Sequence, residues 1–335
     1  MILREFHQFI LFLKERNFQV YGPQEKKGKV FFAEVTKPEE IILDNRLPFY
    51  PPKNFFIPPQ EEIFLYENGQ LKPPKPQSKK QAVLGINILD LKAILLYNHI
   101  FEKDPYYQER WQNTLVVGHS LVPKIEDNIF EEKYEEDILE HLQFDIFLGC
   151  HDRGFRVFTG SRLGQEILDD FGYKKYEHIQ FAGPIKEETC LPCPHRTFCP
   201  AGGQIIEDRL IKLRKGILES DPKIWAELGQ RCLECGKCTI VCPTCFCFRL
   251  DDCPDLKNGS RIRSWDSCFY HDFSEISGGH KFLKTTAERI HFWYYHKFVR
   301  LPDELSLIGC VGCGRCTKVC PVGIDIAKVL AEISK

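Results

Sequence analysis

The sequence lacks an excess of either charge and lacks long apolar runs. Among its 335 residues, 45 are Lys or Arg and 47 are Asp or Glu, so the formal net charge is −2. This balance gives no general attraction to nucleic acid or to an anionic membrane surface. We therefore expect no nucleic-acid partner. Because no apolar run reaches the roughly 20 residues of a spanning helix, we also expect no membrane span.

Several cofactor motifs are also missing. The chain contains no P-loop, no GxGxxG sequence and no HExxH sequence, which are patterns that hold phosphates, dinucleotides and catalytic zinc. None of its cysteines is paired with a base as a catalytic nucleophile would be. We therefore expect no catalytic residues and no nucleotide or flavin site in this chain.

The N-terminus lacks the small-residue cleavage site of an export signal. Residues 1–16 instead place apolar side chains at helical spacing among charged ones, as at Phe6, Phe9 and Leu13. This pattern predicts an amphipathic helix rather than a signal peptide. We therefore expect a cytoplasmic protein.

The remaining pattern predicts a mixed α/β region followed by a helical one. Hydrophobic residues make up 43% of the chain, enough for a packed core. Proline-rich stretches at 47–59 and 72–80 indicate extended connections, because Pro fixes φ and has no backbone N–H. The predicted elements are strands at 82–88 and 114–120, a helix at 89–101, a hairpin at 144–160, a helix at 205–228 and a packed aromatic helix at 291–298. Strand, helix and strand in that order favour a parallel pair.

Cysteine is distributed unevenly. All sixteen cysteines lie between Cys150 and Cys320, and the chain before Cys150 has none. Disulfides are not expected, because the cytosol keeps thiols reduced. Thiols bunched at short spacings in a reducing compartment are typical of metal binding.

Two runs carry the same metal-binding spacing. In both RCLECGKCTIVCP and GCVGCGRCTKVCP, the pattern C-x2-C-x2-C-x3-C is followed by Pro, as in bacterial ferredoxins with [4Fe–4S] clusters. Gly236 and Gly314 let the backbone approach the inorganic sulfides. In two-cluster ferredoxins the fourth cysteine of each motif ligates the other cluster. The predicted ligand sets are Cys232, Cys235, Cys238 and Cys320 for one cluster, and Cys310, Cys313, Cys316 and Cys242 for the other.

Zinc is the alternative for these motifs. Zinc sites more often use two CxxC pairs than three close cysteines with a distant fourth. Two adjacent clusters form an electron relay, which a purely structural staple would not require. The predicted fold is α+β, with an α/β region at 1–205 that carries a cysteine loop at 190–199. A helical region at 206–335 then contains a split ferredoxin-like domain, whose insert at 243–309 should supply docking surface or extra ligands.

Eight further cysteines form two weaker groups. One group is Cys150, Cys190, Cys193 and Cys199, whose Pro-rich CLPCPHRTFC loop favours a third metal centre, more in keeping with [4Fe–4S] than with Zn. His151 and His195 are alternatives to Cys150 as its fourth ligand. The other group is Cys245, Cys247, Cys253 and Cys268. It would hold a further [4Fe–4S] cluster or Zn, or else consist of buried thiols under the clusters, because Cys also packs as a small hydrophobe.

The chain resembles a known family along most of its length. The shared stretches are LPFYPPKNFFIPPQEEIF, AVLGINILD, CLECGKCTIVCPTCFCF, CVGCGRCTKVCP and RSWDSCFYHDFSEISGGHKF, the last with Trp265, Cys268, Gly278, Gly279 and His280 at matching places. They are similar to the β subunits of cytosolic NiFe hydrogenases (sulfhydrogenases). The A subunit of anaerobic sulfite reductase belongs to the same family. Members keep cysteines at the positions of Cys245, Cys247 and Cys268, which favours a metal role for these three.

The resemblance implies a non-catalytic subunit of a cytoplasmic oxidoreductase complex. Such a subunit relays single electrons through [4Fe–4S] clusters between an FAD subunit that reacts with NAD(P) and a NiFe hydrogenase module. An equivalent subunit of an anaerobic sulfite or other reductase is the alternative. A zinc-binding scaffold protein is an alternative of a different class, and would be colourless where iron–sulfur protein is brown.

One departure from the family is clear. Family members carry a cysteine just after the strand that matches 82–88, and a further cysteine group downstream. Here the first place is occupied by Asn87–Asp90, and 115–140 contains no cysteine. A cluster held by those ligands cannot form, and the CLPCPHRTFC loop is a candidate replacement.

Overall fold

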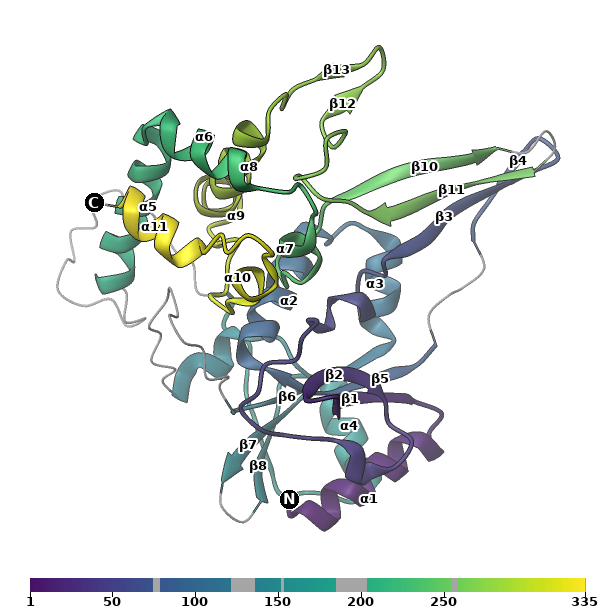
Figure 1. Cartoon of the computed structure of the whole chain (residues 1–335). Helices are drawn as coiled ribbons and strands as arrows, with labels where there is room; N and C mark the ends of the chain where they lie inside the picture. The colour runs from purple at the N-terminus through teal and green to yellow at the C-terminus, as the bar shows by residue number, and fades with distance from the viewer. Residues whose placement is uncertain (75–78, 122–135, 152–153, 185–203, 255–257, 335) are drawn as a thin grey trace. The chain divides into compact units, whose positions relative to one another are not determined.

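The computed structural model describes residues 1–74, 79–121, 136–151, 154–184, 204–254 and 258–334. These residues form two compact units (Figure 1). Unit 1 contains the described residues up to Pro184 together with Phe248–Trp265, and unit 2 contains those of 204–247 and 266–334. The mixture of helices with parallel and antiparallel strands confirms the predicted α+β class.

Unit 1 is built on a seven-stranded sheet with the order β2-β1-β5-β6-β7-β8-β9. Its strands are β1 (Gln19–Lys26), β2 (Lys29–Glu34), β5 (Gln81–Asn87), β6 (Thr114–His119), β7 (Ile146–His151), β8 (Gly154–Thr159) and β9 (Tyr176–His178). The central neighbours β1, β5, β6 and β7 are parallel, and β7 and β8 form the antiparallel pair predicted at 144–160. The predicted parallel pair, β5 and β6, is therefore confirmed.

Helices cover both faces of this sheet. One face packs against α1 (Leu3–Glu15) and α4 (Arg162–Phe171), whose apolar side chains share one core with β5 and β6. The other face packs against α2 (Ile88–Ile100), whose Leu91 fills the space beside Gly118. Helix α3 (Pro105–Gln112) and the short 3-10 turns η1 (Pro38–Glu40), η2 (Pro52–Phe55) and η3 (Glu136–His141) complete the unit. The first proline-rich stretch therefore contains one 3-10 turn.

A second sheet of unit 1 joins segments far apart in the sequence. Its order is β10-β11-β3-β4, from β3 (Gln60–Glu67), β4 (Gln70–Lys72), β10 (Phe248–Pro254) and β11 (Asn258–Trp265). Because β11 pairs antiparallel with β3, the hairpin between the two cysteine motifs belongs to unit 1. The sequence predicts one boundary near residue 205, whereas in the structure a later segment, Phe248–Trp265, returns to unit 1.

Unit 2 is mainly helical. Its elements are α5 (Gln204–Glu219), α6 (Pro222–Arg231), α7 (Lys237–Ile240), β12 (Glu275–Ile276), β13 (His280–Lys281), α8 (Thr286–Tyr295), the π-helical turn η4 (His296–Arg300), α9 (Leu301–Leu305), α10 (Arg315–Val319) and α11 (Ile326–Ile333). The helix predicted at 205–228 is two helices, because Asp221 caps a new helix that starts at Pro222. Within the described residues, no helix is both long and apolar enough to cross a membrane.

A buried charge network anchors the hairpin in unit 1. The Arg263 guanidinium pairs with the carboxylates of Glu61 and Asp104, and Arg110 pairs with Glu61 at 2.7 Å. The Glu61 side chain is only 1% exposed and that of Arg263 is 9% exposed. Removing one partner of such a network leaves an uncompensated buried charge, which costs about 3–5 kcal/mol.

We expect Arg263→Ala to loosen the hairpin. Loss of about 3–5 kcal/mol of local stability should accelerate hydrogen exchange of the 248–265 amides by at least about a hundredfold. The matched control is Arg261→Ala, two residues away on β11, whose pair with the 62%-exposed Asp252 lies in solvent. An exposed pair contributes only about 0–1 kcal/mol, so equal exchange rates in the two variants would contradict the anchoring role.

Candidate iron–sulfur centres

The eight motif cysteines line two cavities within unit 2. The Cys232 cavity is lined by Cys232, Cys235, Cys238 and Cys320, and the Cys310 cavity by Cys310, Cys313, Cys316 and Cys242. Each cavity thus receives three cysteines from one motif and the fourth from the other. This is the same grouping that the ferredoxin spacing predicts.

The two cavities share one wall. Trp293, Cys316 and Ile326 line both of them. Trp293 comes from α8 and Ile326 from α11, so the helical core and the cavities are built from the same elements. The two sets of thiols therefore lie next to each other.

The repeated sequence produces a repeated backbone. Glu234 and Gly312, which occupy equivalent places in the two motifs, have φ values of 54° and 67°. Gly236 and Gly314 have φ values of 66° and 67° and begin α7 and α10. A Cβ on Gly236 would come within 2.6 Å of the Tyr270 ring, so a larger residue is excluded there.

Backbone amides of both loops point at cysteine sulfur. The Glu234 N–H donates to Cys232 Sγ at 3.4 Å, and the Gly312 N–H donates to Cys310 Sγ at 3.5 Å. The Ile324 N–H donates to Cys320 Sγ at 3.2 Å. Such bonds favour thiolate over thiol and adjust the redox potential of a bound cluster.

Burial opposes ionisation of the same thiols. It raises the pKa of Cys238 to about 12, with further contributions from neighbouring thiolates such as Cys232. Burial also raises the pKa of Cys310 to about 12, although Lys297 counteracts part of the effect. Thiolates could gather in these cavities only around a positively charged group, and a metal centre supplies that charge.

Unpaired donors at the cavity walls also fit iron–sulfur clusters. Trp293 Nε1 and Tyr294 Oη are buried and have no hydrogen-bond partner within the described structure. Both residues line the Cys232 cavity, where sulfide or cysteinyl sulfur could accept these bonds. In the described ranges, no group of three or more His, Cys, Asp or Glu is arranged to hold a single metal ion.

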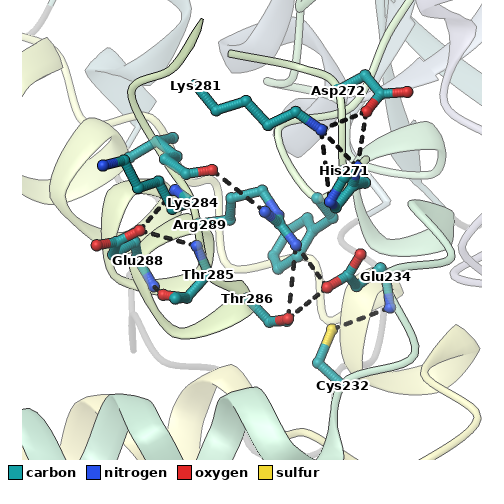
Figure 2. Close-up of polar contacts among 12 residues, drawn as sticks. Cys232, Glu234, His271, Asp272, Lys281, Lys284, Thr285, Thr286, Glu288 and Arg289 are labelled. Atoms are coloured by element: carbon teal, nitrogen blue, oxygen red, sulfur yellow. Dashed lines mark hydrogen bonds and ion pairs between the residues drawn. The ribbon is translucent and has the colours of Figure 1, made fainter. Parts of the chain in front are cut away.

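A buried ion pair fixes the first motif loop (Figure 2). The Arg289 guanidinium donates to Glu234 Oε1 at 2.5 Å, and the Thr286 hydroxyl donates to the same oxygen. Arg289 is 1% exposed, and its Nη1 also donates to the Leu283 carbonyl at 3.3 Å. The pair holds Glu234 in its left-handed conformation, with the amide facing Cys232 (Figure 2).

A buried lysine lies against the other cavity. Lys297, on the π-helical turn η4, is 3% exposed and lines the Cys310 cavity. Its Nζ donates to Cys242 Sγ at 3.4 Å, to Thr244 Oγ1 at 2.9 Å and to the Gly309 carbonyl at 2.6 Å. Burial alone lowers the pKa of Lys297, but the adjacent thiolates raise it well above its usual value.

The second weak cysteine group is only partly assembled. Cys245 is hydrogen-bonded to Cys242, and Cys247 is hydrogen-bonded to Cys268. Cys245 also lies near Cys247, so these three extra thiols gather beside the Cys310 cavity. Cys253 instead is exposed on β10 of unit 1.

The first weak group cannot be followed as a whole. Cys190, Cys193, Cys199 and the alternative ligand His195 lie outside the described residues. Cys150 is on β7, with its amide donating to Ser120 Oγ at 2.8 Å, and His151 ends the same strand. Burial raises the pKa of Cys150.

Buried polar groups occupy the end of β5, where the family resemblance leads us to look for a cysteine. The Asn87 side chain caps α2 by accepting from the Asp90 amide, and it donates to Asp90 Oδ2 at 2.8 Å. Both residues are 1% exposed. A hydrogen-bonded helix cap therefore occupies the end of β5.

Sequence reasoning missed several residues of the site. The aromatic helix at 291–298 was expected only to pack, yet it supplies Trp293, Tyr294 and Lys297 to the cavities. Nothing local marks Lys297, because its partners come from other parts of the chain. Glu234 does carry a signal: it replaces the glycine that the second motif has at position 312.

Comparisons with known proteins agree with these observations. A family model described as a 4Fe-4S dicluster domain matches residues 231–324. The sulfhydrogenase 2 subunit beta of Pyrococcus furiosus is 31% identical, over 98% of this chain and 96% of that protein. No solved structure matches the chain. These matches show an iron–sulfur protein with two [4Fe–4S] clusters and a role in electron transfer. The chain belongs to the family of sulfhydrogenase β subunits.

Proposed function

We propose that this chain relays single electrons between an FAD subunit that reacts with NAD(P) and a NiFe hydrogenase module. The carrying observation is the pair of four-cysteine cavities with a common wall at Trp293, Cys316 and Ile326. When bound, [4Fe–4S] clusters supply one-electron redox chemistry. The hydrogenase partner is favoured because the relative in Pyrococcus furiosus is a sulfhydrogenase subunit.

The proposed ligands are the eight cysteines of the two cavities. Cys232, Cys235, Cys238 and Cys320 hold one cluster, and Cys310, Cys313, Cys316 and Cys242 hold the other. The amides of Glu234, Gly312 and Ile324 stabilise the thiolates by hydrogen bonding. The apolar wall excludes water, which strengthens these electrostatic interactions.

The two cavities differ in their access to solvent. Cys235, in the Cys232 cavity, is exposed, whereas Cys313 and Cys242 of the Cys310 cavity are buried. Next to Cys235, Leu233 is 63% exposed. In this proposal, the Cys232 cavity is the end at which electrons are exchanged with a partner, because transfer needs close approach to the cluster.

We expect Cys235→Ala and Cys313→Ala each to remove one cubane. Loss of one ligand should lower the iron content by about four per chain, and electron transfer between NAD(P)H and the catalytic module should stop. Hydrogenase activity with artificial dyes should persist in the assembled complex, because dyes bypass the relay. Iron quantitation and both assays make the test.

The control for these variants is Cys253→Ala, which removes an exposed thiol of unit 1. It should keep full iron content and full transfer. Full electron transfer with NAD(P)H in either motif variant would refute the relay. If the complex reduced sulfite with artificial dyes and showed no hydrogenase activity, the electron-transfer role would be retained and the catalytic partner would be a sulfite reductase.

Iron, sulfide and zinc quantitation on the anaerobic chain should decide the role of the weaker cysteine groups. About eight irons without zinc would leave both groups without metal, and about twelve would require a third cluster. About eight irons with about one zinc would make one group a structural zinc site. We propose Cys150, Cys190, Cys193 and Cys199 as ligands of a third cluster, and Cys245, Cys247 and Cys268 as candidates for another. Cys150→Ser should then remove about four irons.

We expect Arg289→Met to destabilise the cluster of the Cys232 cavity. Glu234 would keep a partly buried carboxylate without its charged partner, which destabilises the loop. The iron content after purification should fall by up to about four per chain. Restoration should follow in the double variant Glu234→Gly/Arg289→Met, because glycine occupies the equivalent place in the second motif. The matched control is Arg300→Met, whose partner Glu304 is exposed; unchanged iron in the Arg289 variant would contradict the role.

A further inference from the structure

The surroundings of the two cavities differ in charge, although their backbones match. Glu234 of the first loop is an acidic neighbour of Cys232, and its charge is balanced by Arg289. The equivalent residue of the second loop is Gly312, which has no charge. There the ionised neighbour of Cys310 that is not a cysteine is Lys297. Lys237 also lines the Cys232 cavity, but its side chain is exposed, so of the two cavities the Cys310 cavity has the additional buried positive charge.

The position of Lys297 is tightly determined. All three N–H bonds of its ammonium group have acceptors: Cys242 Sγ, Thr244 Oγ1 and the Gly309 carbonyl. The Gly309 N–H in turn donates to the Lys297 carbonyl at 2.9 Å, and a Cβ on Gly309 would come within 2.9 Å of Lys297 Cα. In the part of the chain that the structure describes, no carboxylate forms an ion pair with Lys297. Its charge therefore acts on the thiolates.

The lysine is held by an unusual piece of helix. The turn His296–Arg300 is π-helical and lies between α8 and α9. Such turns are rare and are often found at functional sites. Lys297 Nζ also lies 5.3 Å from the centroid of the Trp293 ring. The helix thus presents the ammonium group to the cavity wall that both sites share.

We propose that Lys297 raises the reduction potential of the cluster in the Cys310 cavity above that of the cluster in the Cys232 cavity, and so fixes the order of electron transfer. The inference rests on the proposed ligand sets. Reduction adds one negative charge, which a buried cation stabilises more strongly than a solvent-exposed one would. In each transfer one electron leaves the Cys232 site, which is oxidised, and enters the Cys310 site, which is reduced. No bond is made or broken, and no proton is required.

The test is an EPR-monitored redox titration of the full chain with each site isolated. Cys235→Ala leaves the Cys310 site, and Cys313→Ala leaves the Cys232 site. Adding Lys297→Met to Cys235→Ala should lower the ratio of reduced to oxidised cluster at a fixed ambient potential at least tenfold, which is about 59 mV for one electron. Adding it to Cys313→Ala should change that ratio less than about threefold, because Lys297 lines the Cys310 cavity and not the Cys232 cavity. Lys297→Arg, which keeps the charge, should restore most of the ratio.

The control for loss of a charge as such is Lys215→Met, on α5, whose side chain is 70% exposed. It should leave both titrations unchanged. Lys297→Met with normal iron and an unchanged ratio at the Cys310 site, or with equal changes at both sites, would overturn the inference.

Two further outcomes keep the test decisive. If Lys297→Met fails to hold iron, comparing Cys235→Ala with Cys313→Ala still decides, because the Cys310 site must have the higher potential. A lower potential there overturns the inference. If Cys235→Ala or Cys313→Ala keeps its full iron content, the proposed ligand set is wrong, which is a different result from an unchanged potential at a correctly assigned site.

Discussion

The geometry of unit 2 depends on one constraint: each four-cysteine cavity is completed by a cysteine from the other motif. Cys242 lines the cavity of the second motif, and Cys320 lines that of the first. Two segments far apart in the sequence must therefore lie side by side before either site is complete. The core of α5, α6, α8 and α11 holds them in this position, and its Trp293 and Ile326 form the common wall. The helical core and the two cysteine groups therefore depend on the same packing contacts.

The same constraint explains how a long insert is tolerated. The hairpin of β10 and β11 leaves unit 2 after Cys247 and returns at Asp266, whose amide donates to the Cys247 carbonyl at 2.9 Å. Because one hydrogen bond joins the two ends of the hairpin, the chain re-enters unit 2 where it left it. Pairing of the hairpin with the sheet of unit 1 therefore does not separate the two cysteine motifs. The buried pairs of Arg263 with Glu61 and Asp104 then fix it within unit 1.

Features with a local signal could be predicted from the sequence, and features made by distant contacts could not. Helix α1, strands β5 and β6 and helix α2 each show their own apolar pattern, and the ferredoxin spacing specified both cysteine groups. Strands β10 and β11 carry many charged residues and become strands by pairing with β3, across nearly 200 residues. In the sequence, Lys297 cannot be told apart from any other helical lysine, because its partners Thr244 and Gly309 come from other parts of the chain. The position of Cys253 also could not be predicted from the sequence. It is close to Cys247 along the chain, but the two residues belong to different units.

Buried charge links the stability of the site to its chemistry. An ammonium group such as that of Lys297 is costly in a core unless negative charge lies beside it. Thiolates at the Cys310 cavity would supply that charge, and the pKa of Cys242 is lowered by the hydrogen bond from Cys245 and by the nearby ammonium of Lys297. At the Cys232 cavity the balance is made within the protein, by Arg289 and Glu234. At the first site the charges of Arg289 and Glu234 therefore compensate each other, whereas at the second site the charge of Lys297 is compensated only when thiolates are present. In our proposal, the ammonium group that stabilises the loaded second site also favours the electron that arrives there.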